Sequence, residues 1–270
     1  MQTRSFSSSR ATLLVALLLF GATAVEAQRE STTWNWRGEL GNGRTVHLRS
    51  VNGEVRFEQG TGNTVEVTAV KRWTRGDPDD VRIEARMTGR GDGDVLICAM
   101  WDDRGRCEVD NYRGGSNNDG WRRNNNVAVN FTVRVPAHAV VDASTVNGDL
   151  IISGTTGAVR AQTVNGDIEA RSSTGRVSAE TVNGSITVRT TIGQNDDVAF
   201  ETVNGSITIE LPANTNADVE LRTVNGRIAS EFPLTLEGSI NPRRIQASIG
   251  SGGPDLRART VNGSIRLEKY

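Results

Sequence analysis

The tetrapeptide Thr-Val-Asn-Gly occurs six times in this chain, and no other feature restricts the fold as strongly. Successive copies start 18, 18, 21, 21 and 37 residues apart. Self-similarity at a period of about 20 residues is typical of solenoids, in which each repeat forms one coil that stacks on the next. The wide last interval predicts two coils, one of which lacks the motif. The copies begin at Thr145, Thr163, Thr181, Thr202, Thr223 and Thr260, and an altered copy, Ser50-Val51-Asn52-Gly53, precedes them.

The residues around each motif have the pattern of short strands. Residues 176–188 align with residues 197–209 nearly position for position, and apolar and polar side chains alternate in both. Such alternation is typical of strands with one buried face. We therefore predict an all-β fold: a single-stranded parallel β-solenoid (β-helix) with two short strands per coil, stacked Asn-Gly corners and an irregular N-terminal β section. Because Asn-Gly between alternating residues is also a strong hairpin signal, an antiparallel meander is the alternative.

Each motif residue has an expected role at the corner of a coil. We expect Thr and Asn to point inward, where Asn amides stacked about 4.8 Å apart bond to each other and to turn carbonyls. Gly is expected because the corner needs a positive φ. The valines either form an exposed apolar column, which would be a contact surface for a partner, or are tucked inside by a bend at Thr. The predicted structural ladder comprises Asn147, Asn165, Asn183, Asn204, Asn225 and Asn262.

The first 27 residues have the pattern of a secretory signal peptide. Arg4 and Arg10 precede an apolar stretch over residues 11–20, and Val25-Glu26-Ala27 fits a cleavage site. We therefore expect an exported protein that is located in the periplasm, at the cell surface or outside the cell. The predicted regions are a signal peptide over 1–27, irregular N-terminal β coils over 28–127, and regular repeats over 128–270 that continue the preceding section.

Composition excludes some classes of partner. The chain has 31 basic and 32 acidic residues and a net charge of −1, so charge gives no reason to expect nucleic acid or anionic lipid. After the signal peptide no apolar stretch reaches the length of about 18 residues that a membrane span needs. An aromatic content of only 5% suits the thin core of Val, Ile, Leu and Ala that stacked coils bury.

The two cysteines, Cys98 and Cys107, predict a disulfide that closes a small loop, because exported proteins meet an oxidising environment. Residues 102–126 are rich in Asp, Asn, Gly and Arg and are expected to form a long surface loop. If the chain binds a ligand such as a surface polysaccharide, this loop is the first candidate. The residues predicted for it are Trp101, Arg104, Arg106, Tyr112, Arg113, Trp121, Arg122 and Arg123.

Motifs that carry catalysis are not found: the chain has no Gly-x-Ser-x-Gly, no phosphate-binding loop and no His-Glu-x-x-His. We predict no catalytic residue, no cofactor and no metal site. Aspartates could ligate calcium, but their spacing matches no recognised loop. Outward glutamates are expected to form a solvated face, although a glycosidase would need paired carboxylates on one face. These acidic residues are Asp77, Asp79, Asp80, Asp92, Asp94, Glu180, Glu201 and Glu220.

Repeated Thr-Val-Asn-Gly-x-Ile motifs behind a signal peptide resemble the bacterial envelope family of unknown function labelled "putative adhesin". The resemblance covers roughly Thr45 to Tyr270. It implies a β-solenoid and an extracytoplasmic location, and it brings no catalytic residues. We therefore expect an exported, non-enzymatic binding module of the cell envelope or surface, with a surface polysaccharide or an envelope protein as partner.

Two other functions stay open at this point. One is a carbohydrate-active β-helix enzyme, a polysaccharide lyase or hydrolase on the same scaffold. The other is a structural or signalling accessory of the envelope, bound by a protein at the C-terminal edge. That edge would lie at residues 264–267, for which the sequence shows no evident cap.

Overall fold

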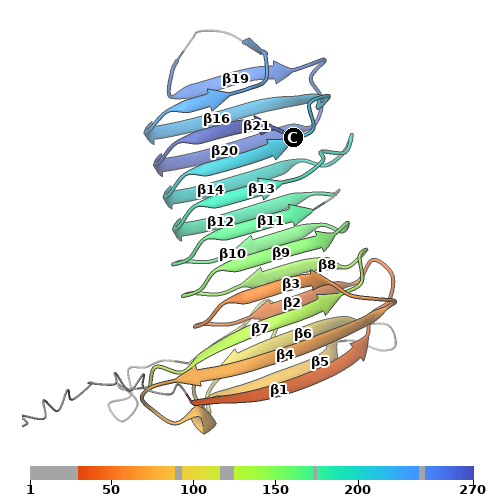
Figure 1. Ribbon diagram of the computed structural model, residues 1–270, viewed down its shortest axis with the longest axis vertical. Helices are drawn as coiled ribbons and strands as arrows, with labels where there is room; N and C mark the ends of the chain where they lie inside the picture. Colours follow the sequence, from red (N-terminus) through yellow and green to blue (C-terminus); the bar gives the residue numbers. More distant parts are fainter. Residues whose placement is uncertain (1–29, 89–92, 116–124, 173–174, 237–240) are drawn as a thin grey trace, which may run out of the picture.

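The computed structural model describes residues 30–88, 93–115, 125–172, 175–236 and 241–270. The predicted signal peptide, Asp92, Trp121, Arg122 and Arg123 lie outside these ranges. Two β-sheets face each other along a tall stack (Figure 1). Within the described ranges the helical structure is one 3-10 turn, η1 (Pro78–Asp80). The prediction of an all-β fold is confirmed.

Both sheets run the full length of the stack, and each has a strand order that differs from the order along the chain. The first sheet, sheet A, comprises in spatial order β1 (Glu30–Glu39), β4 (Thr64–Trp73), β7 (Ala128–Val135), β3 (Val55–Gln59), β9 (Leu150–Thr155), β11 (Ile168–Ser172), β13 (Ile186–Arg189), β15 (Ile207–Leu211), β21 (Ile265–Lys269) and β17 (Ile228–Ser230). The second sheet, sheet B, comprises β18 (Leu234–Leu236), β19 (Arg244–Ile249), β16 (Ala217–Asn225), β20 (Asp255–Asn262), β14 (Val198–Asn204), β12 (Val177–Asn183), β10 (Val159–Gln162), β8 (Val140–Ser144), β2 (Thr45–Arg49), β6 (Asp94–Met100) and β5 (Arg82–Thr88).

The middle of the stack is parallel. In sheet B, β8, β10, β12 and β14 pair in parallel, and in sheet A β9, β11, β13 and β15 do the same. Equivalent residues of successive motifs lie opposite each other, so that Thr181 faces Thr202 and Asn183 faces Asn204. Like therefore stacks on like, and the alternative of an antiparallel meander is wrong.

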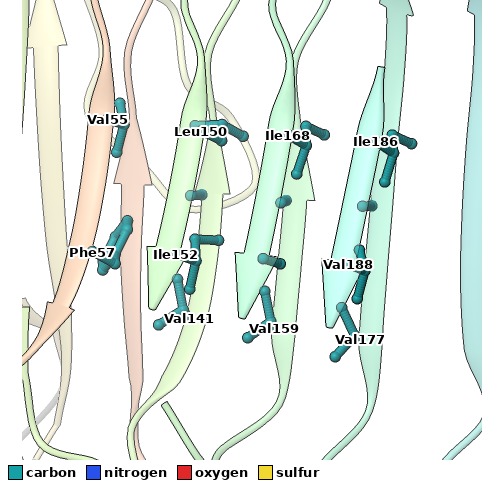
Figure 2. Close-up of a cluster of buried hydrophobic side chains, with 14 of the residues drawn as sticks. Val55, Phe57, Val141, Leu150, Ile152, Val159, Ile168, Val177, Ile186 and Val188 are labelled. Carbon is teal, nitrogen blue, oxygen red and sulfur yellow. The ribbon is translucent and has the colours of Figure 1, made fainter. Parts of the chain in front are cut away.

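One continuous core fills the space between the sheets. Its side chains come from alternate strand positions, because successive residues of a strand point to opposite faces. Each fully buried Val, Leu or Ile of such a core stabilises the fold by about 1.5–3 kcal/mol. Figure 2 shows rows of these side chains, which are at most 2% exposed: Leu150, Ile168 and Ile186 from sheet A, and Val141, Val159 and Val177 from sheet B.

The last motif copy does not lie at the end of the stack. Its strand β20 pairs in parallel with both β14 and β16, and β21 pairs with both β15 and β17. The last coil is therefore inserted between the fourth and fifth copies. The 37-residue interval holds β17 and the antiparallel strands β18 and β19, so the expectation of an extra coil without the motif is wrong.

The C-terminal strand is internal, which also corrects the expectation of an uncapped edge at residues 264–267. The end of the stack is closed by β17 in sheet A and by β19 and β18 in sheet B, and β19 runs antiparallel to β16. At the other end β4 runs antiparallel to both of its neighbours, β1 and β7, and β5 runs antiparallel to β6. Antiparallel strands thus close the N-terminal end of the stack in both sheets and the other end in sheet B, whereas β17 pairs in parallel with β21 (Figure 1).

Candidate binding surface

The motif threonines lie inside the corner and bond to the neighbouring coil. They are only 2–6% exposed. In five of the six copies the hydroxyl donates a hydrogen bond to a glycine carbonyl oxygen of the adjacent coil, as from Thr181 to Gly166 (3.0 Å) and from Thr202 to Gly184 (2.8 Å). A buried hydroxyl without a partner would cost about 1–3 kcal/mol, so these bonds favour Thr at this position.

The motif glycines lie where neighbouring backbones come closest. A Cβ atom on Gly184 would overlap the carbonyl oxygen of Gly166, and one on Gly205 would overlap that of Gly184. Among the corner glycines a positive φ is found only at Gly53 (121°) and Gly166 (158°). The expectation that every corner needs a positive φ is therefore wrong, and the close approach of two coils is what excludes a side chain.

The motif asparagines form a ladder of amide hydrogen bonds along the corner. Asn183 Nδ2 donates to Asn165 Oδ1 (2.8 Å), and Asn204 Nδ2 donates to Asn183 Oδ1 (2.8 Å). All six side chains are exposed, so the expected inward orientation is wrong. Strands such as β12 continue through Thr-Val-Asn, but Thr is the last buried residue, and Val and Asn are both exposed. The spatial order of the ladder is Asn147, Asn165, Asn183, Asn204, Asn262 and Asn225, and in each of its five bonds the amide donates toward the N-terminal end of the stack.

The side chains of the motif valines point to solvent and form no hydrogen bond, although the backbone carbonyl oxygens of Val146 and Val164 accept bonds from the next coil. They are 37–44% exposed, and they supply six of the eight exposed large apolar side chains among the described residues. The backbone stays extended through Thr-Val, as in β12, so the valines are not tucked inside. The alternative of an exposed column is confirmed. In spatial order the column consists of Val146, Val164, Val182, Val203, Val261 and Val224.

A shallow groove of about 590 Å³ follows this column and is bordered by charged side chains. The border is formed by the outward residues that directly precede five of the six motif threonines, and four of these residues are charged. The charge changes along the border from acidic to basic, because the register places Glu201 beside Arg259. Their nearest charged atoms are 3.5 Å apart. In spatial order the border consists of Gln162, Glu180, Glu201, Arg259 and Arg222.

We call the six valines together with this border the valine face. The family described as Toastrack DUF4097 matches residues 44–268, which include every copy of the motif. The chain belongs to the Toastrack family.

Solved structures that resemble this Toastrack chain share little sequence with it. One, described as a putative cell adhesion protein from Clostridium sporogenes, has 11% identity and a TM-score of 0.49, and the match covers 88% of this chain and 100% of that one. Another, described as a putative adhesin from Bacteroides fragilis, has 10% identity and a TM-score of 0.33, with coverage of 88% and 97%. No curated protein matches the chain.

The disulfide predicted for this Toastrack chain, Cys98–Cys107, is confirmed. Nearby aromatic rings are part of the packed structure. Trp101 is 7% exposed, and its indole N–H donates to the carbonyl oxygen of Val127 (3.0 Å). The Tyr112 hydroxyl donates to the carbonyl oxygen of Ala99 (2.5 Å), and burial raises its pKa. Trp101 is therefore buried in the fold, whereas Tyr112 stays partly exposed.

The arginines expected to bind a ligand there are exposed. The backbones of Arg106 and Arg113 pair with each other through two hydrogen bonds of 2.9 Å, and the side chains of both, like that of Arg104, reach solvent. The structure brings Arg106 and Arg113 together but leaves Trp121, Arg122 and Arg123 outside its described part. Ligand binding by this loop stays a prediction.

A buried cluster of charged residues, which the sequence did not indicate, links β2 to β8. His47 Nδ1 lies 2.8 Å from Asp142 Oδ2, and Arg49 donates to the same oxygen (2.6 Å). Burial raises the pKa of Asp142, but the hydrogen bonds from His47 and Arg49 outweigh burial and lower it to about 2. The side chains are 10–17% exposed, so the cluster lies mostly inside the fold, where it stabilises the sheet. Only the register of two distant strands reveals it.

Two further observations concern the part of the Toastrack chain that the structure describes. It contains no group of three or more His, Cys, Asp or Glu side chains placed to hold a metal ion. It also contains no helix that is long and apolar enough to cross a membrane. Asp77, considered above as a calcium ligand, instead accepts a hydrogen bond from the backbone N–H of Asp79 at the start of η1 (2.9 Å).

Proposed function

We propose that this protein is an exported, non-enzymatic binding module of the cell envelope that acts through the valine face. The repeating unit that we infer is one coil of two short strands, closed by the Thr-Val-Asn-Gly corner. Each coil adds one valine to the face, so a stack of coils produces a binding surface whose length depends on the number of repeats.

This proposal is supported by the different roles of the four residues of the motif. Thr, Asn and Gly each contact the neighbouring coil, so the stack itself explains them. Val does not contact it in this way, and an outward strand position accepts Thr or other β-formers equally well. An unbroken column of exposed valines is instead what a protein contact surface requires, because contiguous apolar patches on soluble proteins mark interaction sites.

The chemistry of the face favours a protein over a polysaccharide as partner. Aliphatic methyl groups at intervals of about 4.8 Å provide apolar contact but no aromatic ring on which a sugar could stack. The border of the groove offers charged groups of both signs, which is typical of the polar rim of a protein interface.

A pair of substitutions in two adjacent coils tests the proposal. Val182→Lys with Val203→Lys places two charges in the middle of the face. Because each buried Val contributes about 1.5–3 kcal/mol, we expect at least a tenfold loss of affinity for the washed envelope fraction of the producing cells. Retention of the purified mature chain on that fraction, titrated over concentration, measures the loss.

The matched control lies on the other sheet in the same coils. Thr187 and Thr208 are also β-branched, partly exposed and paired with each other. Thr187→Lys with Thr208→Lys should leave retention unchanged, and circular dichroism should show that both double variants are folded. Equal retention of the valine variant and the wild type would disprove the proposed function.

A further inference from the structure

We infer that the valine face binds the valine face of a second copy of this chain, with the two stacks antiparallel. This inference rests on the proposed function, because it assigns a partner to the same surface. Through this contact the protein forms a weak homodimer. Its two-fold axis lies in the interface and is perpendicular to the stack.

The charges along the valine face are arranged in two blocks. Glu180 and Glu201 occupy neighbouring coils, and Arg259 and Arg222 occupy the next two coils. Arg259 is 3.5 Å from Glu201 and 3.3 Å from Glu220. Glu180 accepts a hydrogen bond from Gln162 (2.8 Å), but neither Glu180 nor Arg222 forms an ion pair within the described residues. The outermost charge of each block is therefore available to a partner.

These two blocks of charge are complementary to those of a second copy in one orientation. A two-fold axis that passes between β14 and β20, perpendicular to the stack, reverses the order of coils in the second copy. Glu201 then faces Arg259 of the second copy, and Glu180 faces Arg222 of the second copy. The reverse contacts follow by symmetry, because a two-fold interface repeats every contact. Four ion pairs therefore form at once.

The same axis also aligns the valines. Val203 meets Val261 of the second copy, and Val182 meets Val224 of the second copy. The alternative two-fold axis, parallel to the stack, would place the charged border opposite the neutral asparagine ladder and would form no ion pairs. The charges therefore select the antiparallel arrangement.

The size of the face predicts a weak dimer. Six valines at strand spacings of about 4.8 Å extend over roughly 24 Å, and the antiparallel overlap uses about four coils. Such an overlap buries an area near or below the lower limit of about 1,000 Å² for stable interfaces. We therefore expect a dissociation constant in the micromolar range or weaker, and a dimer that becomes weaker as salt screens the ion pairs.

Charge reversal at one block at a time tests the inference. Glu180→Arg with Glu201→Arg makes the whole border basic, and Arg222→Glu with Arg259→Glu makes it acidic. We expect sedimentation velocity at low salt to show a wild-type dimer at high micromolar concentration and at least a tenfold weaker dimer for each variant alone. An equimolar mixture of the two variants should restore dimerisation, because opposite borders then face each other.

Matched controls and a second measurement separate charge effects from misfolding. Glu169→Arg with Glu210→Arg changes the same net charge on sheet A and should leave the dimer intact. Circular dichroism melting should be similar for all variants. The chain has two cysteines, both in the disulfide, so an added thiol can be cross-linked specifically. In a mixture of the Val203→Cys and Val261→Cys variants, a short bis-maleimide should form cross-linked dimers more efficiently than in a sample of Val203→Cys alone.

The possible results distinguish the homodimer from the other uses of the valine face. A wild type that remains monomeric at 200 μM at low salt overturns the inference, as does a mixture that fails to dimerise, or cross-linking that is strongest for Val203→Cys alone. If the wild type is monomeric but Val182→Lys with Val203→Lys still abolishes envelope retention, the proposed function stands and the partner is a different protein. If both fail, the valine face is not a binding surface.

Discussion

The identity of each motif residue follows from the distance between neighbouring coils. Hydrogen-bonded parallel strands lie about 4.8 Å apart, so equivalent atoms of successive coils always meet at the same separation. Thr and Asn can each bond across that distance, and at the Gly position the backbones leave no room for a Cβ atom. The motif therefore repeats in the sequence because equivalent residues of successive coils have the same neighbours in the structure.

Gly184→Ala tests this account of the corner. Its Cβ would overlap the carbonyl oxygen of Gly166, so the two coils would have to separate locally. We expect a loss of about 1–3 kcal/mol or more in the free energy of unfolding, as for other overpacked sites, measured by urea denaturation. In Gly60→Ala, the new Cβ would lie 3.3 Å from Arg134 Cβ, and the loss should be much smaller. Equal losses in the two variants would contradict the account.

Between strands, the cluster around Asp142 shows how a pair of elements is held together. The folded pKa of Asp142, about 2, lies below its ordinary value of 3.8. A depressed pKa contributes stability that is present above the unfolded pKa and is lost as pH falls through the folded pKa. The cluster therefore stabilises the contact of β2 with β8 at neutral pH.

We expect the free energy of unfolding to fall by about 1–2 kcal/mol between pH 4 and pH 2, after allowance for solvent screening. The measurement is urea denaturation at several pH values in that window. Asp142→Asn should be less stable than the wild type at pH 6, because Arg49 loses its charged partner, and it should lose this part of the pH dependence. A variant with the same slope as the wild type would show that other carboxylates cause it.

Near the N-terminal end, the strands and the disulfide could be predicted from the sequence, whereas the packing of the aromatic rings could not. Alternation identified the strands, and the compartment suggested the disulfide. The packing of Trp101 and Tyr112 could not be foreseen, because a ring in a polar segment can point to solvent or to the core. Their hydrogen bonds to Val127 and Ala99 join segments that only tertiary structure brings together.

For the molecule as a whole, the order of coils is the feature with the largest consequences. The chain passes from the fourth motif to the fifth, turns back through β18 and β19, and then inserts its C-terminal coil between them. The last 16 residues, 255–270, therefore support strands on both sides. A parallel strand inserted in this way satisfies two edges that would otherwise stay unpaired.

Truncation after Pro254 should therefore have a large effect. Without β20 and β21, the unit of β16, β17 and β19 loses its contact with β14 and β15. We expect a melting temperature at least roughly 10 °C lower and rapid proteolysis within residues 212–254, followed by circular dichroism and mass spectrometry. Leu234→Ser with Leu236→Ser in the edge strand β18 is the control and should change the melting temperature little. A truncated chain that stays as protease-resistant as the control would refute the inserted position.

The sequence by itself determined the all-β architecture, the parallel stacking of like on like, the corner and the disulfide, because each depends on local alternation, spacing or chemistry. Tertiary structure alone decided that Asn and Val face solvent, that the last coil is inserted, and that acidic and basic residues form two blocks along the valine face. The reason is physical: periodicity reports which residues repeat, whereas the spatial order of coils depends on which unpaired edges meet after the chain has turned back. Glu201 and Arg259 are 58 residues apart in the chain and neighbours in the sheet, and no local pattern encodes that pairing.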